Sequence, residues 1–224
     1  MAKIKLSDAD RKAVSDTIAQ SESKTSGEIA VAVTKESYDY AIYETVFALL
    51  GGFLYFVIMS FFVSEIELML QSMFWNYSVN YLVLFYGFST FMVIAILYFL
   101  ANISALDRLI VPPKIRRIKV RERAVRHFME SGVYNTRDRT GILIFISLLE
   151  RRVELIADSG IAVKISQEKW NNIVEIIISG IKKGELTLNL NRAIKECGIL
   201  LQEFFPIKKD DTNELSNEID ILEK

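Results

Sequence analysis

The chain has 224 residues, of which 51% are apolar and 25% are charged, and its formal net charge is −1. The single cysteine, Cys197, excludes an intramolecular disulfide, and one histidine, His127, leaves too few soft ligands for a structural zinc, haem or iron–sulfur site. High apolar and high charged fractions fit together only if the two kinds of residue are separated along the chain. They are, because Glu65 and Glu67 are the only charged residues between Thr45 and Leu106.

The amino-terminal segment predicts one helix and one strand. Ser7 and Asp10 have the spacing of a capping box, which predicts a helix that continues to about Gln20. After a turn, the run EIAVAVT at 28–34 is typical of a buried strand. One helix and one strand cannot bury each other, so their partners must lie beyond the apolar block. We therefore predict a discontinuous cytoplasmic domain formed by residues 1–40 and 107–206.

The apolar block, residues 41–106, predicts a transmembrane hairpin with spans at about 46–63 and 81–101. At about 1.5 Å per residue the first span reaches about 27 Å, close to the thickness of the hydrocarbon layer. A buried hairpin in a soluble core is the alternative, but a small chain cannot enclose two helices that are apolar on every face. The spans contain no charged residue, which favours an anchor over a transporter.

The cations predict the orientation of the hairpin. The loop between the spans has no lysine or arginine, whereas both flanks are rich in them. The positive-inside rule then places both termini in the cytoplasm, in a multi-pass protein of the cytoplasmic (inner) membrane.

A cationic helix is predicted from 114 to 131, ended by Gly132. Its position beside the second span favours binding of anionic lipid headgroups. A nucleic-acid partner is not expected, because these charges lie where the topology rule already requires them. The predicted membrane-surface residues are Lys114, Arg116, Arg117, Lys119, Arg121 and Arg123.

The remaining pattern predicts two strands and two helices. The runs at 141–148 and 152–157 are joined by a link too short for anything but an antiparallel hairpin. One helix is expected from Ser166 to Gly184, another from Thr187 to a point before Pro206. The fold class is α/β, with a small mixed sheet flanked by helices. Residues 207–224 are expected to be an acidic, polar and loosely held tail.

Four sequence segments resemble those of a known family. SGEIAVAV, RTGILIFIS, ERRVELIADSGI and the tail FFPIKKDDTNELSNEI, in this order over nearly the whole chain, resemble the TPM-domain family. The closest likeness is to its bacterial branch of predicted membrane proteins, in which a two-helix transmembrane hairpin interrupts the domain. The resemblance implies a TPM-like α/β/α sandwich. Because the family includes a reported acid phosphatase, photosystem-repair proteins and a receptor accessory protein, it implies no single reaction.

The resemblance also directs attention to one loop. In enzymatic or metal-binding members the loop that enters the central strand is rich in Asp and Asn, whereas residues 134–140 keep one acid, Asp138, between Arg137 and Arg139. One carboxylate cannot hold Ca²⁺ or Mg²⁺ tightly without several other oxygen donors. The candidate catalytic residues are Asp138 and Asp158, and the candidate metal ligands are Glu28, Asp138, Glu154 and Asp158.

For each of these acids a structural role is favoured. Glu28 is expected to cap or pair at a strand start, and Asp138 to pair with a neighbouring arginine. Glu154 is expected on a solvated or arginine-paired face, and Asp158 in an Asx-turn with Ser159. His127 is expected on the surface of its helix.

The preferred functional interpretation is a membrane-anchored, non-catalytic interaction or accessory module. It would bind other membrane proteins, or itself, at the cytoplasmic face, and no cofactor is expected. The alternative is a phosphatase-type hydrolase that uses Ca²⁺ or Mg²⁺. A lipid-binding regulator is a third hypothesis.

Overall fold

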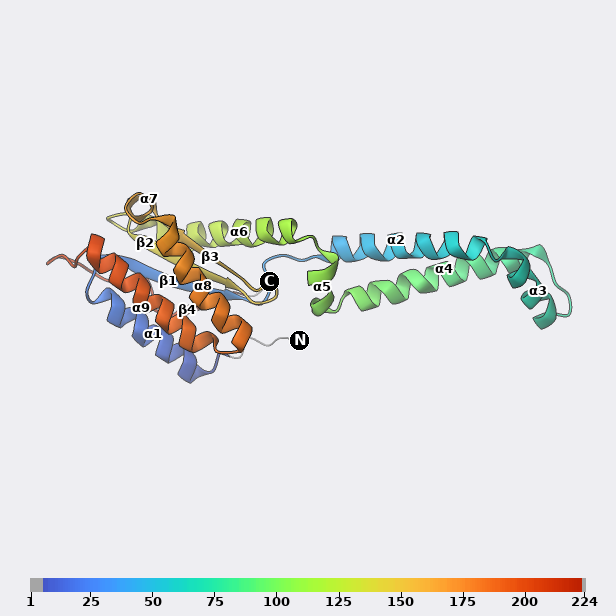
Figure 1. Cartoon of the computed structure of the whole chain (residues 1–224), viewed down its shortest axis with the longest axis horizontal. Coiled ribbons are helices and arrows are strands. Elements are labelled where there is room, and N and C mark those ends of the chain that lie inside the picture. Colours follow the sequence, from blue (N-terminus) through green and yellow to red (C-terminus); the bar gives the residue numbers. More distant parts are fainter. Residues whose placement is uncertain (1–5, 223–224) are drawn as a thin grey trace. The chain divides into compact units, whose positions relative to one another are not determined.

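The computed structural model describes residues 6–222, except for the side chains of residues 104 and 105. The chain divides into two compact units (Figure 1). Residues 39–113 form the first, here called the hairpin unit, and the segments before and after them form the second, the α/β unit.

The α/β unit contains the elements that the sequence pattern predicts, within a few residues. The Ser7 hydroxyl accepts a hydrogen bond from the Asp10 amide (3.1 Å) and the Asp10 carboxylate accepts one from the Ser7 amide (3.0 Å), so the capping box starts α1. Gly132 and Gly184 end the two helices before them with φ of 79° and 76°. The elements are α1 (Asp8–Glu22), β1 (Glu28–Thr34), α6 (Pro113–Glu130), the 3₁₀ helix η1 (Val133–Asn135), β2 (Gly141–Ser147), β3 (Arg152–Ala157), α7 (Ser159–Ala162), α8 (Gln167–Lys183), α9 (Leu186–Phe204) and β4 (Ile219–Leu222).

The strands form a four-stranded mixed sheet in the order β3-β2-β1-β4, over the described part of the chain. β1 and β2 are parallel, with Glu28 opposite Gly141, and the crossover between them contains α6. β2 and β3 are antiparallel, with Phe145 opposite Glu154. The predicted mixed sheet and its hairpin are therefore confirmed.

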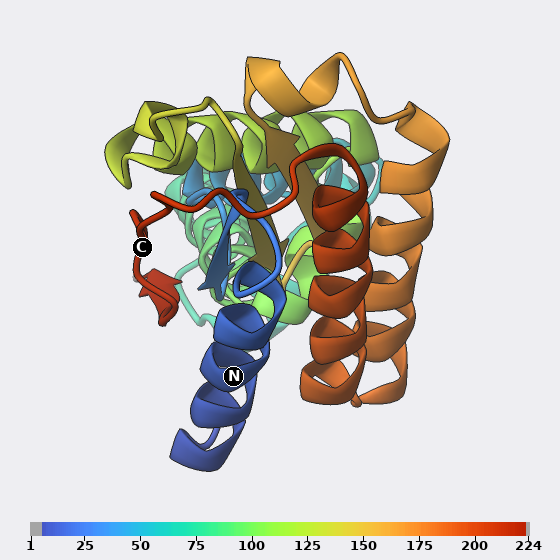
Figure 2. The same cartoon turned by 90° about the vertical axis from the view of Figure 1, so that its left-hand side faces the viewer.

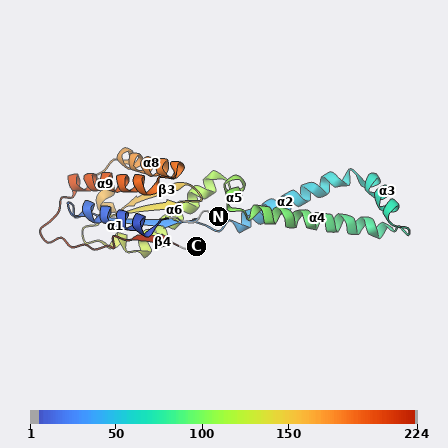
Figure 3. The same ribbon diagram turned by 90° about the horizontal axis from the view of Figure 1, so that it is seen from below.

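Helices cover both faces of this sheet (Figure 3). On one face Ile29, Val31 and Ile144 pack against α1, α8 and α9. On the other face Ala32 and Phe145 pack against the apolar side of α6. Because β1 and β2 are central and covered on both faces, every one of their residues is buried, which explains their nearly continuous apolar sequences.

The carboxyl-terminal segment corrects the prediction of a loosely held tail. Figure 2 shows it leaving α9, crossing the end of the sheet and reaching β4, which pairs in parallel with β1 so that Val31 lies opposite Ile219. The alternation of apolar and acidic residues in EIDIL suits a half-buried edge strand. β4 also corrects the prediction for His127, which is 7% exposed, with its Nε2 3.1 Å from Asp220 Oδ2.

The hairpin unit consists of α2 (Ala41–Ser60), α3 (Val63–Met73), α4 (Val79–Ala101) and α5 (Ser104–Ile110). α2 and α4 are long and apolar enough to cross a membrane, and their most apolar stretches are only 17% and 0% buried. α2 starts and ends a few residues before the predicted first span, and α4 contains the second.

Two glycines let α2 and α4 approach closely. A Cβ at Gly51 would lie 2.4 Å from the Leu97 side chain, and one at Gly52 would lie 2.2 Å from Ile94. At the other end of the pair, the Tyr86 hydroxyl donates a hydrogen bond to the Met59 carbonyl (2.8 Å). Small residues at such a contact allow two helices to pack closely.

Ending the chain after residue 216 removes β4 and the Asp220 contact of His127, and we expect it to lower the free energy of unfolding by about 1–2 kcal/mol. Denaturant unfolding of the full chain in detergent, followed by fluorescence of the buried Trp170 in a Trp75→Phe background, measures this. Asp220→Asn, which keeps the strand, should lower the free energy of unfolding by less. An unchanged midpoint after truncation would show that β4 adds nothing to stability.

Candidate functional site

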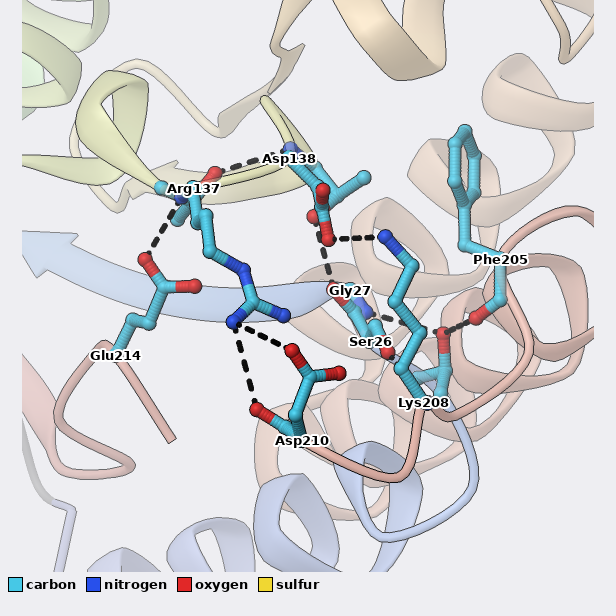
Figure 4. A network of polar contacts seen from close by, with 11 residues as sticks. Ser26, Gly27, Arg137, Asp138, Phe205, Lys208, Asp210 and Glu214 are labelled. Atoms are coloured by element: carbon cyan, nitrogen blue, oxygen red, sulfur yellow. Dashed lines mark hydrogen bonds and ion pairs between the residues drawn. The ribbon is translucent and has the colours of Figure 1, made fainter. Parts of the chain in front are cut away.

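The candidate site lies where β1 and β2 begin, in the loops before them and in the chain after α9 (Figure 4). Because Glu28 pairs with Gly141 in parallel, the two loops lie at the same end of the sheet, where both strands begin. The Glu28 amide donates a hydrogen bond to the Thr140 carbonyl (3.1 Å), and the Thr140 hydroxyl donates one to the Ser26 carbonyl (2.9 Å). These bonds join the loops into one surface.

The chain after α9 closes this surface. The Ser26 amide donates a hydrogen bond to the Phe205 carbonyl (3.1 Å), and the Lys208 amide donates one to the Ser26 hydroxyl (2.9 Å). Figure 4 shows this segment running across the two loops, with Lys208, Asp210 and Glu214 turned toward residues 137 and 138. The tail thus supplies charged groups that face the loop at 137 and 138.

Asp138 binds a lysine from the tail, which corrects the prediction that it pairs with a neighbouring arginine. Its Oδ2 lies 2.7 Å from Lys208 Nζ. The hydrogen bond from Lys208, together with the charges of Lys208 and Arg137, lowers the pKa of the Asp138 carboxyl below its ordinary value. The neighbouring arginines bind other groups because consecutive side chains in this turn point in different directions.

The two arginines of the loop have partners of their own. Arg137 Nη1 lies 3.3 Å from Asp210 Oδ2, and the Arg137 amide donates a hydrogen bond to Glu214 Oε2 (2.8 Å). Arg139, at φ 56°, donates a hydrogen bond to the Tyr134 carbonyl (2.8 Å). All of the charged residues in this loop are therefore paired within the protein.

Glu28 is buried at the start of β1, with 4% of its surface exposed. Its Oε1 accepts a hydrogen bond from the Glu214 amide (3.2 Å), so it pairs at the strand start through the backbone of the tail. Burial raises the pKa of the Glu28 carboxyl, and the nearby charges of Glu214 and Asp211 act in the same direction.

Asp158 follows β3 and is the N-cap of the short helix α7. Its Oδ1 accepts hydrogen bonds from the amide and the hydroxyl of Ser159, a local contact of the kind that the Asx-turn interpretation predicted. Its Oδ2 is buried and lies 3.9 Å from Arg139 Nη1.

Glu154 lies apart from the other three acids. It is opposite Phe145, in the middle of the β2–β3 ladder, about 10 Å along the strand from its end. Its carboxylate lies 3.2 Å from Arg121 Nη1 of α6, as the arginine-paired interpretation predicted.

The structure does not bring any three of the four acids together as ligands for one ion. Within residues 6–222, no three Asp, Glu, His or Cys side chains are placed so that they could hold a metal ion. The donor set explains why: Asp138 binds an ammonium group, Glu28 accepts backbone hydrogen bonds and Asp158 caps a helix. A hard divalent cation needs six to eight oxygen ligands, which these carboxylates do not supply together.

Sequence reasoning missed Glu22, in the last turn of α1. Its Oε1 accepts a hydrogen bond from the Ile29 amide (2.8 Å), whereas its Oε2 is buried without a hydrogen bond. Burial raises the pKa of Glu22 to about 8, and the charges of Glu28 and Asp211 add to the rise. The tail residues Lys208, Asp210 and Glu214 were missed for another reason: the only sequence signal was the alternation in β4, which shows that the tail folds back but not onto which residues.

Comparison with known proteins supports the fold. No protein-family model matches the chain. No curated protein matches it either. The chain is similar to the NMR structure of BA42 protein from the psychrophilic bacterium Bizionia argentinensis, with 21% sequence identity, a TM-score of 0.58 and coverage of 99% of this chain and 100% of that one. At this identity the likeness shows a shared fold alone.

The Glu22 carboxyl predicts a pH dependence of stability. The pKa of the Glu22 carboxyl is about 8 in the folded protein and 4.5 in the unfolded chain. The protonated carboxyl therefore stabilises the fold fully below about pH 4.5, and this contribution is lost as the pH rises to about 8. Glu22→Gln keeps the acceptor for the Ile29 amide and removes the charge. We expect it to raise the free energy of unfolding at pH 8 by at least about 1 kcal/mol, since one pKa unit corresponds to about 1.4 kcal/mol.

The measurement is denaturant unfolding of the full chain at pH 5 and pH 8. Glu130→Gln, at the exposed end of α6, is the matched control and should change stability equally at both pH values. If Glu22→Gln also gave equal changes at pH 5 and pH 8, Glu22 would not titrate between them.

Proposed function

We propose that this protein is a membrane-anchored, TPM-like module that binds other membrane proteins, or a second copy of itself, at the cytoplasmic face of the inner membrane. The observation that carries the proposal is the state of the candidate acids. Asp138, Glu28, Asp158 and Glu154 are each bound by another part of the protein, through Lys208, the tail backbone, Ser159 and Arg121. Side chains with such contacts stabilise the surface and are not free to bind a substrate.

The two apolar helices support the anchoring part of the proposal. Few residues of α2 and none in the most apolar stretch of α4 are buried, and such an apolar surface would not be stable in water. Neither contains a charged residue apart from Glu44 in the first turn of α2, so they offer no path for an ion or proton. The α6 cations, from Lys114 to Arg123, begin soon after α4 in the chain and suit contact with anionic headgroups.

Crosslinking in intact membranes tests the interaction. We expect the tagged full chain, crosslinked before solubilisation, to give reproducible products with specific membrane proteins or with itself, and an unrelated two-span protein with the same tag to give none of them. Sedimentation in detergent then separates self-association from other partners. A strictly monomeric chain without crosslinked products would contradict the proposal.

The same protein tests the hydrolase alternative. Turnover of p-nitrophenyl phosphate in Ca²⁺ or Mg²⁺, at acidic and neutral pH, that disappears in Asp138→Ala would favour a phosphatase. Asp8→Ala, on the exposed start of α1, is the matched control. We expect no turnover that depends on Asp138, because its carboxylate is neutralised by Lys208.

Single cysteines test the orientation. Asn76→Cys, between α3 and α4, should react with a membrane-impermeant maleimide in intact cells, and Ser23→Cys should react only after the membrane is opened. The native Cys197 should not react with the maleimide, because it is fully buried and burial raises its thiol pKa to about 12. Labelling of Ser23→Cys in intact cells would reverse the proposed orientation.

A further inference from the structure

The two edges of the sheet differ. β4 covers one side of β1, whereas no strand of the described chain pairs with the outer side of β3. All six residues of β3 line a groove of about 900 Å³ that runs along this free edge. An unpaired edge presents backbone N–H and C=O groups that can bind another extended chain.

Helices form the two walls of the groove, which we call the β3 groove. α6 supplies Arg117 and Arg121 on one side, and α8 supplies Trp170 and Val174, together with the polar Gln167 and Asn171, on the other. Trp170 is 5% exposed, so it forms a fixed part of the apolar wall. The groove thus combines a strand edge, a cationic side and a side on which apolar residues alternate with uncharged polar ones.

The charges of the groove favour an acidic occupant. Arg117, Arg121 and Arg152 line it, and Glu154 is its only acidic lining residue in the described chain. Glu154 pairs with Arg121 at 3.2 Å, which leaves the two other guanidinium groups to set the sign of the field. Guanidinium groups bind carboxylates with two parallel hydrogen bonds when the geometry allows it.

We propose that the β3 groove binds an extended, acidic segment of a partner protein, which adds to the sheet as a strand beside β3. Backbone hydrogen bonds to β3 hold the segment, its carboxylates bind the arginines that line the groove, and its apolar residues contact Trp170 and Val174 of α8. This inference rests on the proposed interaction function, and it names the binding surface and the chemistry of the partner.

An anionic lipid headgroup is the competing occupant. A phosphate would use the arginines of α6 but neither the strand edge nor the Trp170 wall, whereas an extended peptide uses all three. Separate probes distinguish the two.

The probe is a seven-residue peptide, Glu-Val-Glu-Val-Asp-Val-Glu, that carries a dansyl group and is titrated into the full chain in detergent. In a Trp75→Phe background Trp170 is the only tryptophan, so energy transfer to dansyl reports binding near the groove. We expect saturable binding in the micromolar range. The same peptide with alternate backbone amides methylated, or with glutamine and asparagine in place of its acids, should bind at least tenfold more weakly.

Charge reversal on one helix gives the matched variants. Arg117→Glu with Arg121→Glu should weaken binding at least tenfold, and Arg117→Gln with Arg121→Gln should weaken it without adding negative charge. Lys114→Glu with Arg126→Glu changes the net charge equally on the same helix, outside the groove lining, and should bind the probe as the unaltered chain does.

Three results would overturn the inference: no saturable binding, equal binding of the methylated peptide, or displacement of the probe by vesicles of anionic lipid but not by unlabelled peptide. If the chain with Arg117→Glu and Arg121→Glu still gave the crosslinked products, the partner would bind outside the β3 groove. The proposed function would then stand without this inference. Loss of all crosslinked products from the unaltered chain would instead contradict the proposed function.

Discussion

The parallel pairing of β1 with β2 is the constraint on which the rest of the α/β unit depends. β1 is apolar from Ile29 to Val33, and it is buried only because β2 and β4 lie beside it and helices cover its two faces. β2 comes after the whole hairpin unit and after α6 in the chain. The α/β unit therefore forms only when the segments before and after the hairpin unit meet, and the crossover supplies the helix that covers one face.

The same pairing decides what the candidate acids can do. It brings the loops before β1 and β2 to one end of the sheet, where their carboxyl groups would repel one another and lose hydration. The tail offsets part of this cost, because Lys208 neutralises Asp138 and a backbone amide of the tail binds Glu28, although the tail charges of Glu214 and Asp211 act against the Glu28 carboxylate. At Glu22, whose Oε2 is buried without a hydrogen bond, burial raises the pKa of the carboxyl to about 8.

The tail also makes the two edges of the sheet unequal. β4 protects the β1 edge and fixes His127 beside Asp220, whereas no described strand pairs with the outer edge of β3, which lies between the cationic α6 and the amphipathic α8. A free edge carries a risk of non-specific pairing that proteins usually limit with charge or cover. Here the arginines and the two helices restrict which chain could bind, in keeping with the interaction function that we propose.

Local sequence was enough to predict the fold class and, in the described chain, the six long helices and the three long strands. Capping residues, glycines with positive φ and apolar periodicity act over a few neighbouring residues, so these elements follow from local chemistry. The separation of charge along the chain likewise located the two long apolar helices. Tertiary structure alone decided the partners of the site residues. Lys208 is 70 residues from Asp138, and Glu214 is 186 residues from Glu28, so no local pattern predicts these contacts. The strand formed by the tail, the shifted pKa of Glu22 and the open β3 groove depend on which surfaces meet in space, which is set by packing and burial over the whole unit.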